Sequence, residues 1–194
     1  KEASSPDADI LTLSAHHDSV PTAYGASDNA SGVAALLYAA QALRDVPTDT
    51  QVRFISFTDE ENGKNGSRAY TASLSEEEKD RMIGDMQFDM LGGLGSDGTL
   101  VCTMDGEANW VSDLLQEKDP SLERGAETAS DHASLQLAGV PSVLLMQNGE
   151  GYLYHTAADT ADQLNLYAIA SAAETAVEAA EEICSPNTDS YREL

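Results

Sequence analysis

The sequence predicts an α/β protein, in which helices cover both faces of a mixed, mostly parallel sheet and form a three-layer αβα sandwich. Short apolar segments of strand length alternate along the chain with segments of helical periodicity, which is typical of this class. Acidic residues and histidines follow the ends of the apolar segments, where open α/β sheets form their sites. The 194 residues are enough for one domain with a core of its own.

In the first half of the chain, apolar runs of strand length alternate with segments whose apolar residues have helical spacing. Leu36, Leu37, Ala40 and Leu43 recur at helical spacing, and Pro47 follows the end of their segment. We expect strands at 10–15 and 52–57, helices at about 31–44 and 66–74, and a further helix that starts at the capping box Ser75-Glu76-Glu77-Glu78.

The second half continues the alternation. The turn signal Asp97-Gly98 lies between two apolar segments, so we expect these segments to pair as a hairpin. The expected strands are 86–91, 99–104 and 140–146, and the expected helices are 110–115, 132–138 and a last one from the cap at 160–163 to just before Pro186. The last helix should bury one face, formed by Ile169, Ala173, Val177, Ala180 and Ile183.

Polar segments at both ends predict the domain boundaries. We expect residues 1–8 and 185–194 to be tails and residues 9–184 to form the folded domain. Cys102 and Cys184 lie far apart and form no CxxC motif, so two buried free thiols and a single disulfide both remain open.

The charge of the chain excludes one class of partner. Ten basic and 34 acidic residues give a net charge of −24 at pH 7, which repels nucleic acid phosphates and attracts cations and amines. The same acidity also suits solubility in a salty or extracellular setting. No apolar run approaches the length that spans a membrane, so we expect no membrane span.

The adjacent pair Glu60-Glu61 directly follows the apolar strand expected at 52–57. Two neighbouring acids repel each other, which destabilises the fold unless a cation lies between them. Neighbouring side chains point to different sides, so one carboxylate can bind a metal while the other reaches a water. A solvated acidic loop is the alternative interpretation of this pair.

Further segments place metal-type ligands at expected strand ends and helix starts. They contain His16 with Asp18, Asp28, Asp89 and His155. Imidazole and carboxylate together suit zinc better than calcium, which prefers oxygen ligands. Asp18 lies where it could accept the second ring N–H of His16. Each of three residues also has an ordinary interpretation when taken singly: His16 as a polar strand end, Asp28 as a helix cap and His155 as a surface histidine. Asp89 differs, because a carboxylate in an apolar strand needs a partner.

The order of these segments is that of a known family. Along the chain they read AHHDS, GASDNASGVAALL, FTDEENGKNGS, FDMLGG, SDHASLQLAGVP and YHTAADTADQL. With these motifs the chain resembles, from about residue 9 to residue 183, the M28 zinc aminopeptidases, which are co-catalytic dizinc exopeptidases. The resemblance implies the zinc-dependent exopeptidase fold for residues 9–184.

The resemblance also implies a metal ligand set with two zinc ions per chain. Asp28 would bridge the two ions. His16 and Glu61 would complete one site, and Asp89 and His155 would complete the other.

Further roles follow from the same resemblance. Glu60 would be the general base, and Asp18 would orient the first histidine ligand. Tyr154 would help to stabilise the tetrahedral intermediate, with simple packing as the alternative. Asp131 and His132 match a segment that lines the site in the family without reliably binding metal.

The implied activity is that of a zinc-dependent aminopeptidase, which uses a water shared by the two zinc ions to hydrolyse the N-terminal peptide bond of peptides with a free N-terminus. Family habit and the acidity of the chain suggest a secreted or cell-envelope, extracellular location. Only 15 residues precede His16, whereas the family places a helix and strands there. We therefore expect a minimal version of the fold or one without its N-terminal sheet elements, and a free sheet edge would favour a homodimer.

Three other functions remain open from the sequence. A single-zinc aminoacyl (glutaminyl) cyclase would use the same fold with one metal. A non-catalytic binding domain would be expected to have lost some of the ligands, all of which are present. A calcium-binding acidic module suits the charge but leaves His16 and His155 unexplained.

Overall fold

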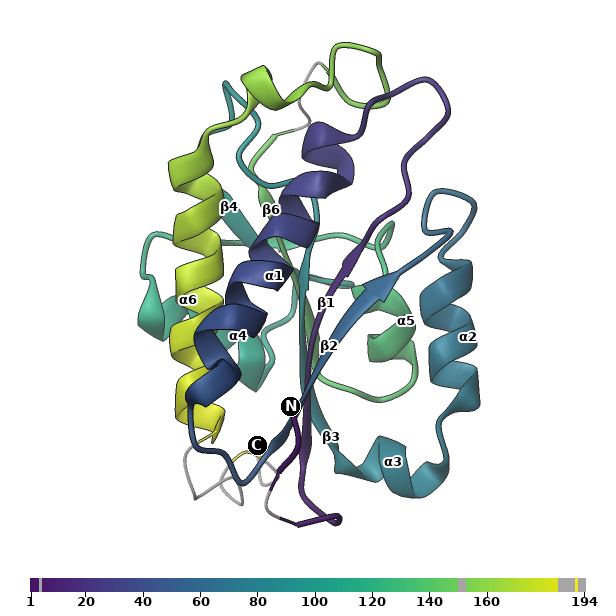
Figure 1. Cartoon of the computed structure of the whole chain (residues 1–194), viewed down its shortest axis with the longest axis vertical. Coiled ribbons are helices and arrows are strands. Elements are labelled where there is room, and N and C mark those ends of the chain that lie inside the picture. The colour runs from purple at the N-terminus through teal and green to yellow at the C-terminus, as the bar shows by residue number, and fades with distance from the viewer. Residues whose placement is uncertain (4, 150–152, 185–190, 192–194) are drawn as a thin grey trace.

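The computed structural model describes residues 1–3, 5–149, 153–184 and 191, and a single six-stranded sheet runs through its centre (Figure 1). The order of the strands in the sheet is β2-β1-β3-β6-β4-β5. All neighbouring strands are parallel except β4 and β6. The strands are β1 (Ile10–His16), β2 (Gln51–Phe57), β3 (Met82–Phe88), β4 (Thr99–Thr103), β5 (Glu123–Ala126) and β6 (Ser142–Gln147).

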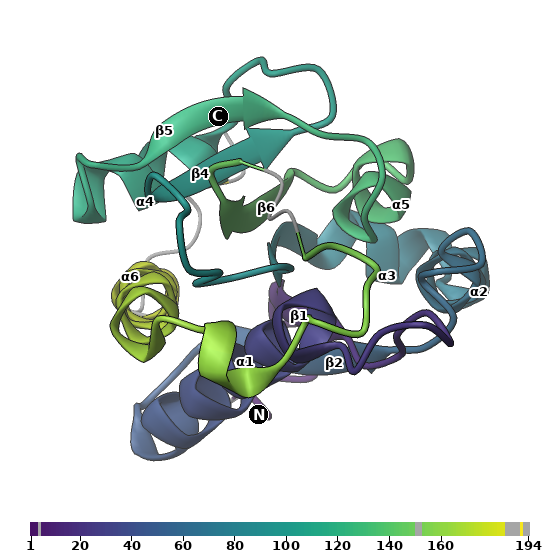
Figure 2. The same cartoon turned by 90° about the horizontal axis from the view of Figure 1, so that it is seen from above.

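Helices cover both faces of this sheet, as Figure 2 shows from above. One face carries α1 (Gly32–Ala42), α4 (Trp110–Lys118) and α6 (Leu166–Cys184). The other carries α2 (Asn65–Ser73), α3 (Glu76–Arg81) and α5 (His132–Leu137). Short helical turns at Ala26–Ser31, Leu43–Asp45 and Ala161–Gln163 lie between these elements. The predicted three-layer αβα class is confirmed.

The two faces of the sheet differ in polarity because side chains alternate along each strand. Leu11, Leu13 and Ala15 of β1 belong to the large apolar core that includes α1, α4 and α6. The alternate residues Thr12 and Ser14 are buried on the opposite side. The predicted inner face of α6 is confirmed, since all five of its residues lie in the large core.

The expected hairpin between 86–91 and 99–104 is wrong. β3 ends at Phe88, and the chain turns at Met90 and Gly92, both of which have positive φ angles. β3 pairs with β1 on one side and β6 on the other, so β4 has no free edge of β3 to join and lies antiparallel to β6. A local turn signal cannot identify the strand that a segment joins.

Other parts of the chain also depart from the expectations. The short edge strand β5 was not expected, because its sequence Glu-Arg-Gly-Ala has no apolar alternation. Lys1, in the expected N-terminal tail, exchanges main-chain hydrogen bonds with Val52 at the outer edge of β2. Of the expected C-terminal tail, only Tyr191 lies within the described residues, and its ring packs on Trp110 with centroids 4.7 Å apart. Cys102 and Cys184 are both buried free thiols.

A buried acid occupies the polar face of the sheet. Asp85 in β3 is fully buried, and its Oδ1 accepts a hydrogen bond of 3.2 Å from the hydroxyl of Ser14. Within the described residues, its Oδ2 has no hydrogen-bond partner. Burial raises the pKa of Asp85 well above the ordinary value of an aspartate, so the folded protein holds a proton there at pH values where the unfolded chain has released it.

We predict that Asp85→Asn reduces the pH dependence of stability. Since the folded pKa is raised, the free energy of unfolding of the wild type should fall as the pH rises from about 4 through the folded pKa. The variant has no such proton, so its advantage over the wild type should grow from pH 5 to pH 8 and reach about 1 kcal/mol or more. Urea denaturation at both pH values measures this, with Asp80→Asn on the exposed surface as control. An Asp85→Asn variant whose stability follows the wild-type pH profile would contradict the prediction.

Candidate metal centre

The topology brings the candidate ligands to one edge of the sheet. The strands β1, β2 and β3 are parallel, so their carboxyl ends meet at this edge. His16 ends β1, Glu60 and Glu61 follow β2, and Asp89 follows β3. The other two candidate ligands lie in connecting segments. Asp28 is in the irregular turn before α1, and His155 is in the segment that follows β6.

The ligands form two groups that share one carboxylate. Nε2 of His16 lies 3.3 Å from Oδ1 of Asp28 and 3.1 Å from Oδ1 of Asp89. Nε2 of His155 lies 3.1 Å from Oδ2 of Asp28 and 3.0 Å from Oε2 of Glu61. Within each group the ligand atoms all lie within 4.8 Å of one another. Asp28 therefore gives one oxygen to each group, which is the arrangement expected of a carboxylate that bridges two metal ions.

The expected distribution of the other ligands over the two sites is wrong. His16 groups with Asp89 and not with Glu61, and His155 groups with Glu61 and not with Asp89. The reason lies in the sheet, because β1 and β3 are neighbours and their ends place His16 beside Asp89. His155 reaches the opposite side of Asp28 from its loop, where Glu61 lies.

Asp18 fixes this site in a different way from the one expected. Nδ1 of His16 hydrogen-bonds the main-chain oxygen of Asp18 at 3.1 Å, and the carboxylate lies further away, at 3.5 Å. The carboxylate of Asp18 instead accepts the main-chain N–H groups of Glu60 (3.1 Å) and Glu61 (3.2 Å). Asp18 thus orients His16 so that Nε2 of this histidine faces the carboxylates of Asp28 and Asp89. Its own carboxylate holds the pair Glu60-Glu61 in place.

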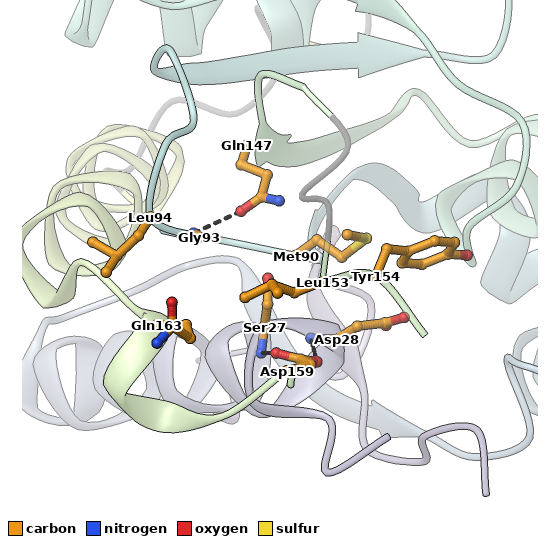
Figure 3. Close-up of a pocket in the computed structure, with 10 residues that line it drawn as sticks. All are labelled: Ser27, Asp28, Met90, Gly93, Leu94, Gln147, Leu153, Tyr154, Asp159 and Gln163. Carbon is orange, nitrogen blue, oxygen red and sulfur yellow. Dashed lines mark hydrogen bonds between the residues drawn. The ribbon is translucent and has the colours of Figure 1, made fainter. Parts of the chain in front are cut away.

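Asp159, which the sequence analysis did not single out, holds the shared ligand. Its carboxylate is buried and accepts the main-chain N–H groups of Ser27 (2.6 Å) and Asp28 (3.1 Å), as Figure 3 shows. The turn at Asp28 and Asn29 departs from helical geometry, so these N–H groups need a partner outside the turn. Asp159 lies four residues after His155 in the motif YHTAADT, and that position was the signal that could have identified it.

A chain of buried polar groups holds Asp89. Its Oδ2 accepts a hydrogen bond of 2.6 Å from the hydroxyl of Ser130, which in turn accepts one of 2.6 Å from the side-chain amide of Gln87. The main-chain N–H of His132 donates to the other end of the Gln87 amide. The SDH segment therefore lines the site through Ser130, while Asp131 lies outside both ligand groups and accepts a hydrogen bond from Ser67.

Glu60 remains outside both ligand groups but lies beside them. It lines a pocket of about 150 Å³ together with Asp28, Asp89, Met90 and Tyr154. Burial and the charge of Asp89 raise the pKa of Glu60 to about 8. A carboxyl group with a pKa near neutrality, next to a metal-type site and facing a pocket, has the properties of a general base.

Tyr154 forms one wall of the same pocket. Its ring stacks on the imidazole of His155, with centroids 3.7 Å apart and an angle of 23° between the planes. Burial and the surrounding carboxylates raise the pKa of Tyr154 to about 12, so its hydroxyl keeps its proton at neutral pH and can donate a hydrogen bond. The position of Tyr154 fits both packing and a role at the reacting carbonyl.

The donor set fits two zinc ions. Each group combines one imidazole nitrogen with carboxylate oxygens, a mixture that zinc accepts and calcium does not favour. The Nε2 atom of His155 is buried and makes no hydrogen bond within the described residues, although two carboxylate oxygens lie within 3.1 Å of it. Burial lowers the pKa of His16, but Asp28 and Asp89 outweigh this effect and raise the pKa to about 12, which shows how strongly the site favours a positive charge.

The fold and the two overlapping ligand groups define an α/β domain with a candidate metal centre at the carboxyl ends of its parallel strands. The sequence model of the family described as "Peptidase family M28" matches residues 1–180, and the chain belongs to this family. It is 39% identical to "Aminopeptidase YwaD" of Bacillus subtilis over 143 residues, which cover 69% of the chain and 31% of that protein. It is 32% identical to the "Probable lipoprotein aminopeptidase LpqL" of Mycobacterium tuberculosis over 74% of the chain and 32% of that protein.

Solved structures show the same likeness. The aminopeptidase from Aneurinibacillus sp. strain AM-1 superposes with a TM-score of 0.91 and 37% identity, over 96% of this chain and 47% of that one. BSAP, described as a zinc aminopeptidase from Bacillus subtilis, superposes with a TM-score of 0.93 and 30% identity, over 97% of this chain and 49% of that one. The chain thus spans about a third of the length of these two curated relatives and about half of these two solved chains.

We predict that Asp159→Asn weakens metal binding by about 10- to 100-fold, as is typical when a group that orients a ligand is lost. The amide would present a donor to main-chain N–H groups that need an acceptor, so Asp28 would lose its fixed position. Competition with a chromophoric zinc chelator measures the affinity. Asp162→Asn is the matched control, because that carboxylate is exposed and accepts hydrogen bonds from the neighbouring side chains of Thr160 and Gln163. Equal zinc affinity in both variants would remove Asp159 from this role.

Proposed function

We propose that this chain is the catalytic part of a zinc-dependent aminopeptidase. The observation that supports this most strongly is the pair of ligand groups that share Asp28, with Glu60 beside them and uncommitted to either. A structural metal site would not need a buried carboxyl group with a raised pKa at its open side. The relatives named as aminopeptidases support the same function.

The two groups would each hold one zinc ion. His16, Asp28 and Asp89 would bind one, and Asp28, Glu61 and His155 would bind the other. Bound there, the ions would supply Lewis-acid polarisation of the scissile carbonyl and a lower pKa for the attacking water. The number of ions and the role of each ligand are part of this proposal.

Glu60 would move the proton of the reaction. It faces the pocket next to both ligand groups, so its carboxylate can take a proton from the attacking water and then give it to the leaving amine. Its raised pKa, about 8, suits both transfers near neutral pH. Tyr154 lines the same pocket, and its hydroxyl could donate a hydrogen bond to the carbonyl oxygen as negative charge develops.

The substrate would be a peptide with a free N-terminus. Asp28, Glu60 and Asp89 line the pocket, and their negative charges favour a protonated amine over an acylated one. Met90, Leu144 and Met146 also line it and provide apolar surface, which suits an aliphatic N-terminal side chain. The pocket therefore accommodates one residue and leaves the remainder of the peptide outside.

We also propose an extracellular or cell-envelope location and keep the homodimer as a hypothesis. The net charge of −24 and the relative described as a lipoprotein aminopeptidase support the location. Within the described residues, no helix combines the length and the apolar character that a membrane crossing requires.

The glutaminyl cyclase from Bacteroides thetaiotaomicron, at 20% identity and a TM-score of 0.75, shares the fold only, so cyclase activity is an outcome for the test below.

We predict that the chain hydrolyses leucine p-nitroanilide in a zinc-dependent manner and leaves the N-acetylated substrate intact. Glu60→Gln should keep the zinc content and lower kcat by about 100- to 10,000-fold, since general-base catalysis contributes that much. Release of p-nitroaniline with added zinc and with a chelator measures both effects.

Glu107→Gln, at an exposed position away from the pocket, is the matched control and should keep the wild-type rate. Cleavage of the acetylated substrate would contradict the recognition of a free amine. Wild-type turnover in Glu60→Gln would remove Glu60 from the base role. Cyclisation of an N-terminal glutamine without any p-nitroaniline release would favour the cyclase.

A further inference from the structure

A second hollow lies between the facing sides of α2 and α5, which lie side by side on the same face of the sheet in both views (Figures 1 and 2). We call it the α2–α5 groove. Its volume is about 490 Å³, and it is lined by Lys64, Arg68, Thr71, Ala72, Met104, Thr128, Ala133, Ser134, Leu137 and Ala138. None of the roles assigned above uses this groove.

The groove is basic in a strongly acidic chain. Its lining holds two cations and no acid, although the chain has 34 acidic and only ten basic residues. Lys64 is the residue directly before α2, Arg68 lies in the first turns of this helix, and both line the groove. Two cations of the groove thus face a space that carries no compensating carboxylate.

Arg68 differs from most other cations of the chain. Its side chain is exposed and forms no ion pair within the described residues. Ion pairs to nearby acids are instead formed by Arg44, Arg53, Lys79, Lys118 and Arg124. A guanidinium that is free in this acidic surface can form two parallel hydrogen bonds to an incoming carboxylate.

The groove and the catalytic pocket are neighbours on either side of one segment. Within residues 127–130, Glu127, Ala129 and Ser130 line the pocket and Thr128 lines the groove. Nζ of Lys64 donates a hydrogen bond of 2.9 Å to the main-chain oxygen of Thr128 and ties the groove to this segment. The main chain of Lys64 also donates to the carbonyl oxygen of Glu60, at 2.8 Å.

From this geometry we propose that the α2–α5 groove binds the part of a peptide substrate beyond the scissile bond and that Arg68, with Lys64, selects a carboxylate there. The proposal rests on the proposed aminopeptidase function, in which the N-terminal residue fills the catalytic pocket and the rest of the peptide has to leave it. The carboxylate is either the C-terminus of a short peptide or an acidic side chain of a longer one.

The dimensions of the groove limit the length of the peptide that it serves. Its lining residues along α2 and the residue before it run from Lys64 to Ala72, about 12 Å at the helical rise of 1.5 Å per residue. An extended peptide covers that distance with three to four residues at about 3.4 Å each. The exposed Leu137 and the side chain of Met104 give the groove apolar surface for side chains between the two ends.

The test compares peptides that differ only in this carboxylate. Leucine followed by one to four alanines is offered as the free acid and as the C-terminal amide, and a second set of amides carries one glutamate at successive positions. We expect kcat/KM to be about two- to fivefold higher for the carboxylate form at the matching length or position, as for a partly exposed ion pair. Salt at 0.5 M should reduce the difference, because it screens exposed charges.

Arg68→Gln should abolish this preference, whereas the matched control Arg44→Gln, which removes an exposed cation far from the groove, should retain it. Leucine p-nitroanilide has no peptide beyond the scissile bond, so its kcat/KM should be equal in the wild type, Arg68→Gln and Arg44→Gln. Equal kcat/KM for acids and amides at every length, or a preference that survives Arg68→Gln, would overturn the proposal while leaving the aminopeptidase function intact.

A binding measurement keeps the two proposals distinguishable if leucine p-nitroanilide is not cleaved. Leu-Ala-Ala-Ala with a free N-terminus, as acid and as amide, is then titrated into the wild type and Arg68→Gln by calorimetry. Tighter binding of the acid to the wild type alone supports the groove even though the proposed activity fails. Equal binding of acid and amide to the wild type removes the groove from peptide recognition.

Discussion

The repulsion between carboxylates at one edge of the sheet is the constraint on which the site depends. Asp28, Glu60, Glu61 and Asp89 converge on a small volume, partly buried from water. Negative charges at such distances destabilise a fold unless a cation neutralises them. Burial and the charge of Asp89 raise the pKa of Glu60, and Asp28 and Asp89 raise the pKa of His16 against the effect of burial. The proposed zinc ions would neutralise this charge.

The scaffold resists that repulsion through hydrogen bonds to fixed groups. Asp18 accepts the main chain of the acidic pair, Asp159 accepts the main chain before Asp28, and Ser130 donates to Asp89. These contacts join segments up to 132 residues apart in the sequence. They place the ligands at the carboxyl edge of the sheet, while one face of its strands packs into the apolar core of α1, α4 and α6. Stability and chemistry thus depend on different parts of the same strands.

The alternation of apolar segments was sufficient to predict the αβα class. Ligand types at strand ends suggested that these side chains converge, and the ligand set itself followed from the resemblance to a known family. The distribution of ligands over two groups was not predictable, because it depends on β1 lying beside β3 and on the path of the loop that holds His155. The expected hairpin failed for a related reason, since strand partners are chosen by the whole sheet. Asp159 was missed because its partners are remote in sequence, whereas its own neighbourhood indicates only a cap.

Zinc stoichiometry tests the central claim most directly. The metal-free chain is reconstituted with zinc, freed of excess metal and analysed by plasma mass spectrometry alongside Asp28→Ala. The account predicts about two zinc ions per wild-type chain and fewer than one in the variant, because the two groups share that carboxylate. One ion or none per wild-type chain, or an unchanged count in Asp28→Ala, would contradict the shared-ligand site.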